Sequence, residues 1–182
     1  MDLIKEIKEI KKQLSKLEKF AEEEKKAKQL TISDIKVGEQ FVYGDKNYTK
    51  LNEECFVIID DFIFDFMYCI FDPITNNYDE SLVRYYINSD RFIKKLGVDK
   101  QDIKNYYLND YITLLSKEEF YSYEELIRDY GGFYWTRFAS SSSRACVISS
   151  VGNINAIVSD ANRVRVCFTL KPNTPVSRKV DE

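Results

Sequence analysis

Histidine, the residue type best suited to acid–base chemistry near neutral pH, is absent from this chain of 182 residues. Histidine is the commonest general base and the commonest zinc ligand in proteins. Four consecutive serines stand at Ser140 to Ser143, but a serine nucleophile needs an adjacent base, and no lysine follows at Ser-x-x-Lys spacing. The sequence therefore predicts a protein that is not an enzyme and that uses no cofactor.

Carboxylates and thiols remain as candidates for metal or redox chemistry. Four aspartates lie in or beside the apolar stretch from residue 55 to 71: Asp60, Asp61, Asp65 and Asp72. They lack the glycine-punctuated spacing of a calcium loop, and carboxylates beside strands usually face water. Each cysteine lies in an apolar run, without a Cys-x-x-Cys pair: Cys55, Cys69, Cys146 and Cys167. We predict no metal site and free, buried thiols, with an unrecognised disulfide as the alternative.

Charge and hydropathy argue against two classes of partner. The chain has 27 basic and 30 acidic residues, a net charge of -3, so nucleic acid is not expected as a partner. The longest apolar-rich stretch, from Cys55 to Phe71, is interrupted by aspartates and cannot span a bilayer. Lysine or glutamate interrupts the N-terminus every few residues, unlike the apolar core of a signal peptide. We expect no membrane binding and no secretion by a signal peptide.

Residues 2–30 are predicted to form one amphipathic helix. Its apolar residues recur at spacings of four and three, which is the heptad seam of a coiled coil: Leu3, Ile7, Ile10, Leu14, Leu17 and Ala21. Two interpretations remain open. The seam from Leu3 to Leu17 joins copies of the chain, or the helix packs on its own domain.

The heptad register indicates how copies would associate. With Ile7 at position a, Glu6 falls at g and Lys11 at the following e, which is an attractive pair across a parallel seam. Isoleucine at d, at Ile10, favours three strands over two. Because Glu24 occupies a core position after the seam fades, the helix alone would be only marginally stable as an oligomer.

The first half of the remaining chain mixes strand and helix patterns. Alternating residues over 35–44 and 47–51 flank a Gly-Asp-Lys turn and predict a hairpin, and the apolar run Cys55 to Ile59 predicts a buried strand. Helices are expected over 81–96, closed by Gly97, and over 99–107. A strand is expected over 111–115. Ser116 followed by Glu119 has the capping-box form, so a helix is expected from there toward residue 130.

The second half is predicted to be rich in strands. Four strands are expected, over 133–138, 144–150, 153–159 and 163–170. Gly131 and Gly132 end the preceding helix, and either Tyr134 or Trp135 points into the core. The serine run is expected to form a loop and Val151-Gly152-Asn153 a hairpin turn. The predicted organisation is a helix over 1–30, an α+β domain over 31–172 and a loose polar tail over 173–182.

Five motifs follow one another in the order found in a known protein family. They are Ile35-Lys36-Val37-Gly38-Glu39-Gln40-Phe41, Leu114-Leu115-Ser116, Trp135-Thr136-Arg137-Phe138, the hairpin over 148–155 and Asn162-Arg163-Val164-Arg165-Val166-Cys167-Phe168. In this order, over residues 32–171, the chain resembles a family of unknown function from low-GC Gram-positive bacteria and their phages. Ala139 replaces the proline that follows the tryptophan motif in that family.

The resemblance implies a fold similar to C-type-lectin-like domains and the related sulfatase-modifying factors. The expected C-terminal domain is a compact α+β module with a small twisted antiparallel sheet and flanking helices. The calcium loops of sugar-binding C-type lectins, E-P-N or Q-P-D followed by W-N-D, are absent, so calcium-dependent sugar binding is not expected. Arg137 and Arg165 stand in matching family motifs. Each guanidinium either contacts a ligand or is held inside the fold by a carboxylate and backbone carbonyls.

The resulting functional hypothesis is a non-enzymatic phage or prophage particle component, such as a capsid- or tail-attached decoration, fibre or receptor-contact protein. It would associate with itself, preferably as a trimer, or with neighbouring virion subunits, and would contact a host surface or a protein ligand. The expected location is the virion, or the host cytoplasm during assembly. A small phage-encoded accessory factor that inhibits a host protein is the alternative. The candidate ligand-binding residues are Trp135, Arg137, Ser140, Ser141, Ser142, Arg144, Asn162 and Arg163.

Overall fold

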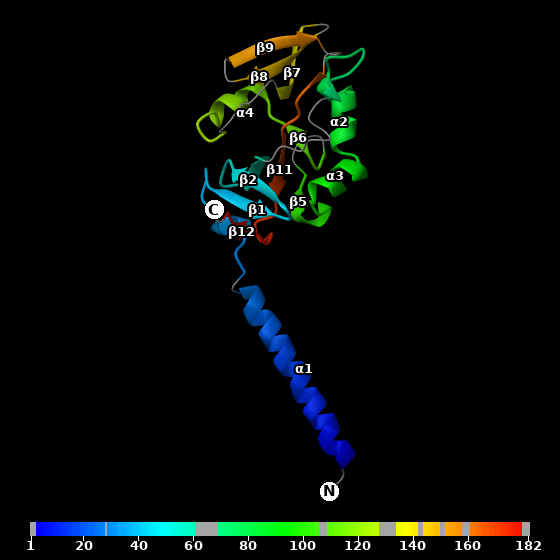
Figure 1. The fold of residues 1–182 in the computed structure, drawn as a ribbon, viewed down its shortest axis with the longest axis vertical. Helices are drawn as coiled ribbons and strands as arrows, with labels where there is room; N and C mark the ends of the chain where they lie inside the picture. Colours follow the sequence, from blue (N-terminus) through cyan, green and yellow to red (C-terminus); the bar gives the residue numbers. More distant parts are fainter. Residues whose placement is uncertain are drawn as a thin grey trace. The chain divides into compact units, whose positions relative to one another are not determined.

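The computed structural model describes residues 3–27, 29–60, 69–105, 109–127, 134–141, 144–149, 152–157 and 161–179. The chain divides into two compact units, Met1–Leu30 and Thr31–Glu182, called here the N-terminal and C-terminal units. The N-terminal unit contains one helix, α1, Leu3–Ala27 (Figure 1). This helix confirms the prediction made from the heptad spacing.

The C-terminal unit is α+β, as the sequence predicts, and most of its strands belong to one antiparallel sheet. These strands are β1 Gln40–Tyr43, β2 Lys46–Lys50, β3 Phe56–Ile59, β5 Ile103–Lys104, β6 Thr113–Leu114, β11 Val166–Leu170 and β12 Ser177–Arg178. Their order is β12-β1-β2-β3-β11-β5, and β6 also pairs with β11. The pairs recorded between them are antiparallel.

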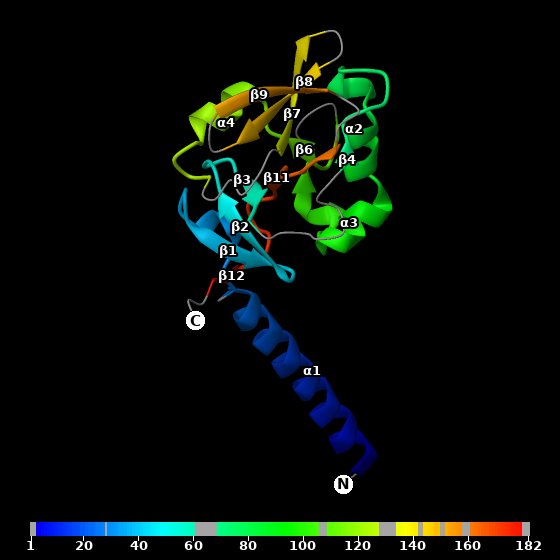
Figure 2. The same ribbon diagram turned by 45° about the horizontal axis from the view of Figure 1, so that its top comes forward.

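Two smaller sheets complete the strands of the C-terminal unit. One has the order β7-β8-β9 and consists of β7 Tyr134–Ser141, β8 Arg144–Ser149 and β9 Gly152–Ile157. The other pairs β4, Cys69–Ile70, with β10, Ala161–Asn162. The β7-β8-β9 sheet and the β1-β2-β12 edge of the main sheet lie at opposite ends of the unit (Figures 1 and 2).

The first hairpin forms because Gly44 supplies the backbone conformation that a two-residue turn needs. Tyr43 pairs with Lys46, and Gly44 has a φ of +62°, in the left-handed region. A Cβ atom on Gly44 would lie 3.0 Å from the carbonyl oxygen of Gly97, so the turn also packs closely on another segment. The predicted hairpin is confirmed, and so is the buried strand that follows it, β3.

The helix predicted over 81–96 is two helices, α2 Leu82–Ile87 and α3 Asp90–Leu96. The break occurs because the Asn88 side chain accepts hydrogen bonds from the backbone amides of Tyr111 and Ile112, and Ser89 starts a new helix by accepting from the Phe92 amide. Gly97 ends α3 with a φ of +68°, as predicted.

The prediction of a helix over 99–107 was wrong for residues 99–105, and residues 106 and 107 lie outside the described residues. That segment begins with a short 3-10 turn, Lys100–Asp102, and continues as β5. The helix at the capping box is confirmed as α4, Lys117–Ser122, with reciprocal bonds between Ser116 and Glu119. Turns follow α4 up to Ile127, and the remainder of the predicted helix lies outside the described residues.

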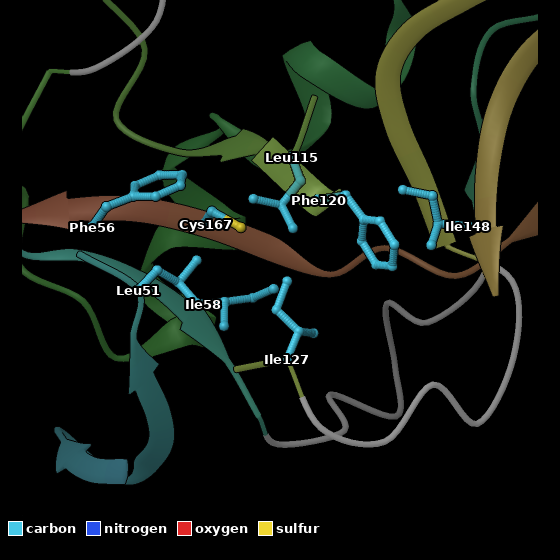
Figure 3. Packing of buried hydrophobic residues seen from close by; sticks show 8 residues of the cluster. All are labelled: Leu51, Phe56, Ile58, Leu115, Phe120, Ile127, Ile148 and Cys167. Atoms are coloured by element: carbon cyan, nitrogen blue, oxygen red, sulfur yellow. The ribbon is translucent and has the colours of Figure 1, made fainter. Parts of the chain in front are cut away.

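One hydrophobic cluster joins the main sheet to the β7-β8-β9 sheet. Cys167 of β11 and Ile58 of β3 pack in the same cluster as Phe120 of α4 and Ile148 of β8 (Figure 3). The other members are Leu51, Phe56, Leu115 and Ile127. Because residues far apart in sequence share this cluster, the two sheets are held in a fixed arrangement.

The prediction of a loose tail over 173–182 was also wrong for residues 173–179, and residues 180–182 lie outside the described residues. Thr174 and Val176 are buried, and β12 pairs with β1. Pro175 forms an antiparallel bridge with Thr31, at the start of the C-terminal unit. Alternate burial of two residues in an otherwise polar stretch is too short a pattern to distinguish a strand from a loop.

Candidate functional site

The helix α1 carries an exposed apolar stripe, here called the α1 seam: Ile7, Ile10, Leu14 and Leu17. Between 46% and 66% of the surface of each of these residues is exposed. The spacing of three and four residues places them on one side of the helix. Phe20, which is 62% exposed, widens the stripe at its C-terminal end. Leu3 belongs to α1, but its side chain lies outside the described part of the structure.

Trp135 is not a surface contact, contrary to the expectation that it binds a ligand. Its side chain is buried, and its ring meets that of Phe71 edge to face with 5.3 Å between centroids. Strand alternation explains this, because Trp135 pairs with the buried Val147 of β8. Trp135 is the inward-pointing residue that the sequence predicts at either 134 or 135.

The Arg137 guanidinium is held by protein groups. It donates to the Leu114 carbonyl oxygen at 2.6 Å and to a Glu119 carboxylate oxygen at 2.6 Å. Its side chain is mostly buried. The two contacts tie β7 to β6 and to the first turn of α4, so the structure supports the second of the two interpretations of this arginine.

Arg165 is held in the same manner at the start of β11. Its guanidinium donates to the Ile59 carbonyl oxygen at 2.9 Å and to the Asp60 carboxylate at 2.8 Å. The same carboxylate accepts hydrogen bonds from Thr49 and Gln40. The arrangement joins β11 to the end of β3 and to the hairpin. Asp60, one of the aspartates considered as a metal ligand, is thus bound by protein donors.

The remaining candidate residues do not form a single site. Ser141 and Arg144 pair with each other where β7 meets β8, and Arg144 is exposed. Arg163 bridges Tyr134, at the other end of β7. An eight-residue strand is roughly 23 Å long, so Arg163 and Arg144 lie far apart. Asn162 belongs to β10, beside Arg163.

The first two residues of the serine run predicted as a loop extend β7 instead, and Ser142 and Ser143 lie outside the described residues. Ser140 and Ser141 belong to β7, although their side chains lie outside the description. Two residues of the hairpin turn predicted at Val151-Gly152-Asn153 are strand residues instead, because Gly152 and Asn153 belong to β9 and pair with β8. Val151 lies outside the described residues.

A polar cavity that sequence reasoning missed lies between the first hairpin and β12. Its volume is about 340 Å³, and its lining includes Gly38, Glu39, Gln40, Thr49, Leu126, Arg178 and Lys179. The Lys179 ammonium donates to the Gln40 side chain at 3.0 Å, so part of the wall is already satisfied internally. The sequence contained no signal for this cavity, because residues about 140 positions apart form its walls.

Three cysteine thiols are held in the unreactive protonated form. Burial raises the pKa of the thiols of Cys55, Cys146 and Cys167, which disfavours the reactive thiolate. These three cysteines are free and buried, as predicted. Within the described ranges, no three His, Cys, Asp or Glu side chains gather closely enough to hold a metal ion.

Burial tends to raise the pKa of the Asp72 carboxyl. The backbone amides of Ile74, Thr75 and Leu82 donate to it and outweigh that effect, so its pKa lies below the usual value. This carboxylate therefore holds the 72–75 turn against the start of α2. Asp72 thus has three protein donors in place of the metal ion considered from the sequence.

Comparison of the chain with known protein families, with curated proteins and with solved structures finds no match. Among the described helices, none is both long enough and apolar enough to cross a membrane.

Proposed function

We propose that this chain is a non-enzymatic assembly and binding protein, in which the α1 seam associates with α1 of other copies and the C-terminal unit presents a recognition surface. The observation that carries the proposal is the exposure of the α1 seam. Four large apolar side chains on one stripe of a 25-residue helix remain at least 46% exposed in the single chain. Such a stripe favours association with another helix.

Approximate energies support self-association that depends on each seam residue. Fully burying a leucine or isoleucine contributes about 1.5–3 kcal/mol, so covering the exposed half of one seam residue contributes about 1 kcal/mol. Four seam residues thus contribute about 4 kcal/mol per helix, against an association cost of about 4–15 kcal/mol. Two helices together gain about 8 kcal/mol, which lies within the range of this cost. The number of strands follows instead from isoleucine at d, at Ile10, which favours three over two, so we propose a homotrimer.

The proposed setting is a phage or prophage particle, where the protein acts as a decoration, fibre or receptor-contact component. The order of the family motifs along residues 32–171 supports this setting. The same resemblance, together with the α+β architecture, supports a C-type-lectin-like assignment for the C-terminal unit. In such an assembly, weak recognition by each copy is strengthened by multivalency.

The proposal is tested by the mass of the full chain in solution, measured by size-exclusion chromatography with light scattering. Leu14→Glu puts a charge in the α1 seam, whereas Ser15→Glu adds the same charge on the neighbouring, outward-facing position. We expect the wild type and Ser15→Glu to be trimers at micromolar concentration and Leu14→Glu to be a monomer. Wild type that is monomeric at all concentrations would overturn the proposal and favour docking of α1 on a different protein.

A further inference from the structure

The strand β9 differs from the other edge strands that the structure describes. It pairs with β8 on one side, and no strand among the described residues pairs with its outer edge. An exposed edge offers unpaired backbone amides and carbonyls to any extended segment, so proteins usually shorten, charge or cover their edges.

The other described edges of this protein show those protective features. The strands β12 and β5 have two residues each and contain Arg178 and Lys104. The second edge of β7 is covered. The backbone amide of Trp135 donates a hydrogen bond to the Arg163 carbonyl, and that of Arg137 donates to the Leu115 carbonyl.

By contrast, β9 has six residues, Gly-Asn-Ile-Asn-Ala-Ile, with no charge and no proline. It pairs with β8 at six consecutive positions without a bulge. It is therefore the one described edge that is long, regular and uncharged, the properties that favour addition of another strand.

We propose that the outer edge of β9 pairs antiparallel with β9 of a second copy of this chain. The order Asn153-Ile154-Asn155 reads the same in both directions. With Ile154 opposite Ile154 of the second copy, Asn153 stands opposite Asn155 of that copy, and the reverse pair is identical. A two-fold axis through Ile154 thus gives one apolar pair and two amide pairs, with no like charges opposed.

This pairing does not rest on the α1 proposal, because it uses only the C-terminal unit. A two-fold contact at β9 and a three-fold contact at α1 would together link separate trimers, giving assemblies larger than a trimer at high concentration. The mass of Leu14→Glu in solution tests the α1 proposal. Cross-linking and association of the β9 variants described below test the β9 proposal.

Disulfide trapping in the full chain tests the register. In the proposed pair, Ile154→Cys places two thiols directly opposite, within the Cα separation that a disulfide requires. Asn153→Cys places each thiol opposite Asn155 of the second copy instead. We expect mild oxidation to cross-link Ile154→Cys at least about tenfold faster than Asn153→Cys and the wild type. Equal rates for the two variants, or no cross-link in folded Ile154→Cys, would overturn the proposal.

Pairs of charged substitutions test the same contact without a covalent bond. They keep the proposal testable if the cysteine variant fails to fold. Asn153→Lys with Asn155→Lys opposes two pairs of like charges, whereas Asn153→Lys with Asn155→Glu opposes two pairs of unlike charges. With Leu14→Glu added to both variants so that α1 does not associate, we expect about tenfold or greater weakening of dimerisation in the first variant, and retention in the second. Equal association of the two folded variants at low salt would contradict the pairing.

Discussion

Removal of the Arg165 guanidinium is expected to destabilise the C-terminal unit. Arg165→Met keeps an unbranched side chain in place of the aliphatic stem and deletes both guanidinium contacts, to the Ile59 carbonyl and to the Asp60 carboxylate. The side chains of Arg165 and Asp60 are only 11% and 13% exposed, so water does not replace these contacts well.

The magnitude follows from which groups lose their partners. Breaking a buried ion pair costs about 3–5 kcal/mol, because the remaining charge is left without compensation. Asp60 keeps the hydroxyl of Thr49 at 2.6 Å and the amide of Gln40 at 3.1 Å, so the cost lies at the low end. We expect a loss of about 3 kcal/mol in the free energy of unfolding. Arg165→Lys, which cannot reach both partners, should lose about half as much.

Urea unfolding followed by circular dichroism measures this loss. With a denaturant dependence of about 2 kcal/mol per molar, the midpoint of Arg165→Met should fall by about 1.5 M at an unchanged slope. The control is Arg178→Met, because Arg178 is 65% exposed and lies 3.9 Å from Glu39, so it should change stability by less than about 0.5 kcal/mol. If Arg165→Met unfolds like this control, the structural role assigned to Arg165 is wrong.

Two further outcomes follow from the titratable groups. Because its pKa lies below that in the unfolded chain, ionised Asp72 contributes stability above about pH 4 that is lost as the pH falls through the folded value. Asp72→Asn should lower the free energy of unfolding by about 2 kcal/mol at pH 7 and by much less at pH 2. Urea titrations of the wild type and the variant at both pH values measure this loss. The same loss at both pH values would contradict the role assigned to the ionised Asp72 carboxylate. Burial should protect three cysteines from thiol reagents until the chain unfolds: Cys55, Cys146 and Cys167. Peptide mass spectrometry after labelling measures this protection. Modification of any of the three in the folded protein would contradict their burial.

Local signals in the sequence predicted those elements whose cause is local. Gly44 closes a two-residue turn by its own backbone conformation, and Ser116 caps α4 with Glu119 three positions later. The heptad spacing of α1 also depends only on neighbouring residues. These features were correct because no distant group was needed to form them.

The elements that sequence reasoning missed depend on distant partners. Asn88 breaks the helix over 81–96 by bonding residues 111 and 112, and no local pattern records that contact. The segment after residue 102 becomes a strand because β11 pairs with it. Trp135 was predicted to bind a ligand, whereas the distant Phe71 packs against it inside the core.

The bridge between Thr31 and Pro175 has a consequence for engineering. The residues on either side of an antiparallel bridge are about 5 Å apart, so the start of the C-terminal unit lies close to the residues just before its last described strand, β12. A linker of a few residues can therefore join the end of β12 to residue 31. The unit should tolerate circular permutation with new termini in an exposed turn, and it should fit as an insert within a surface loop of a carrier protein.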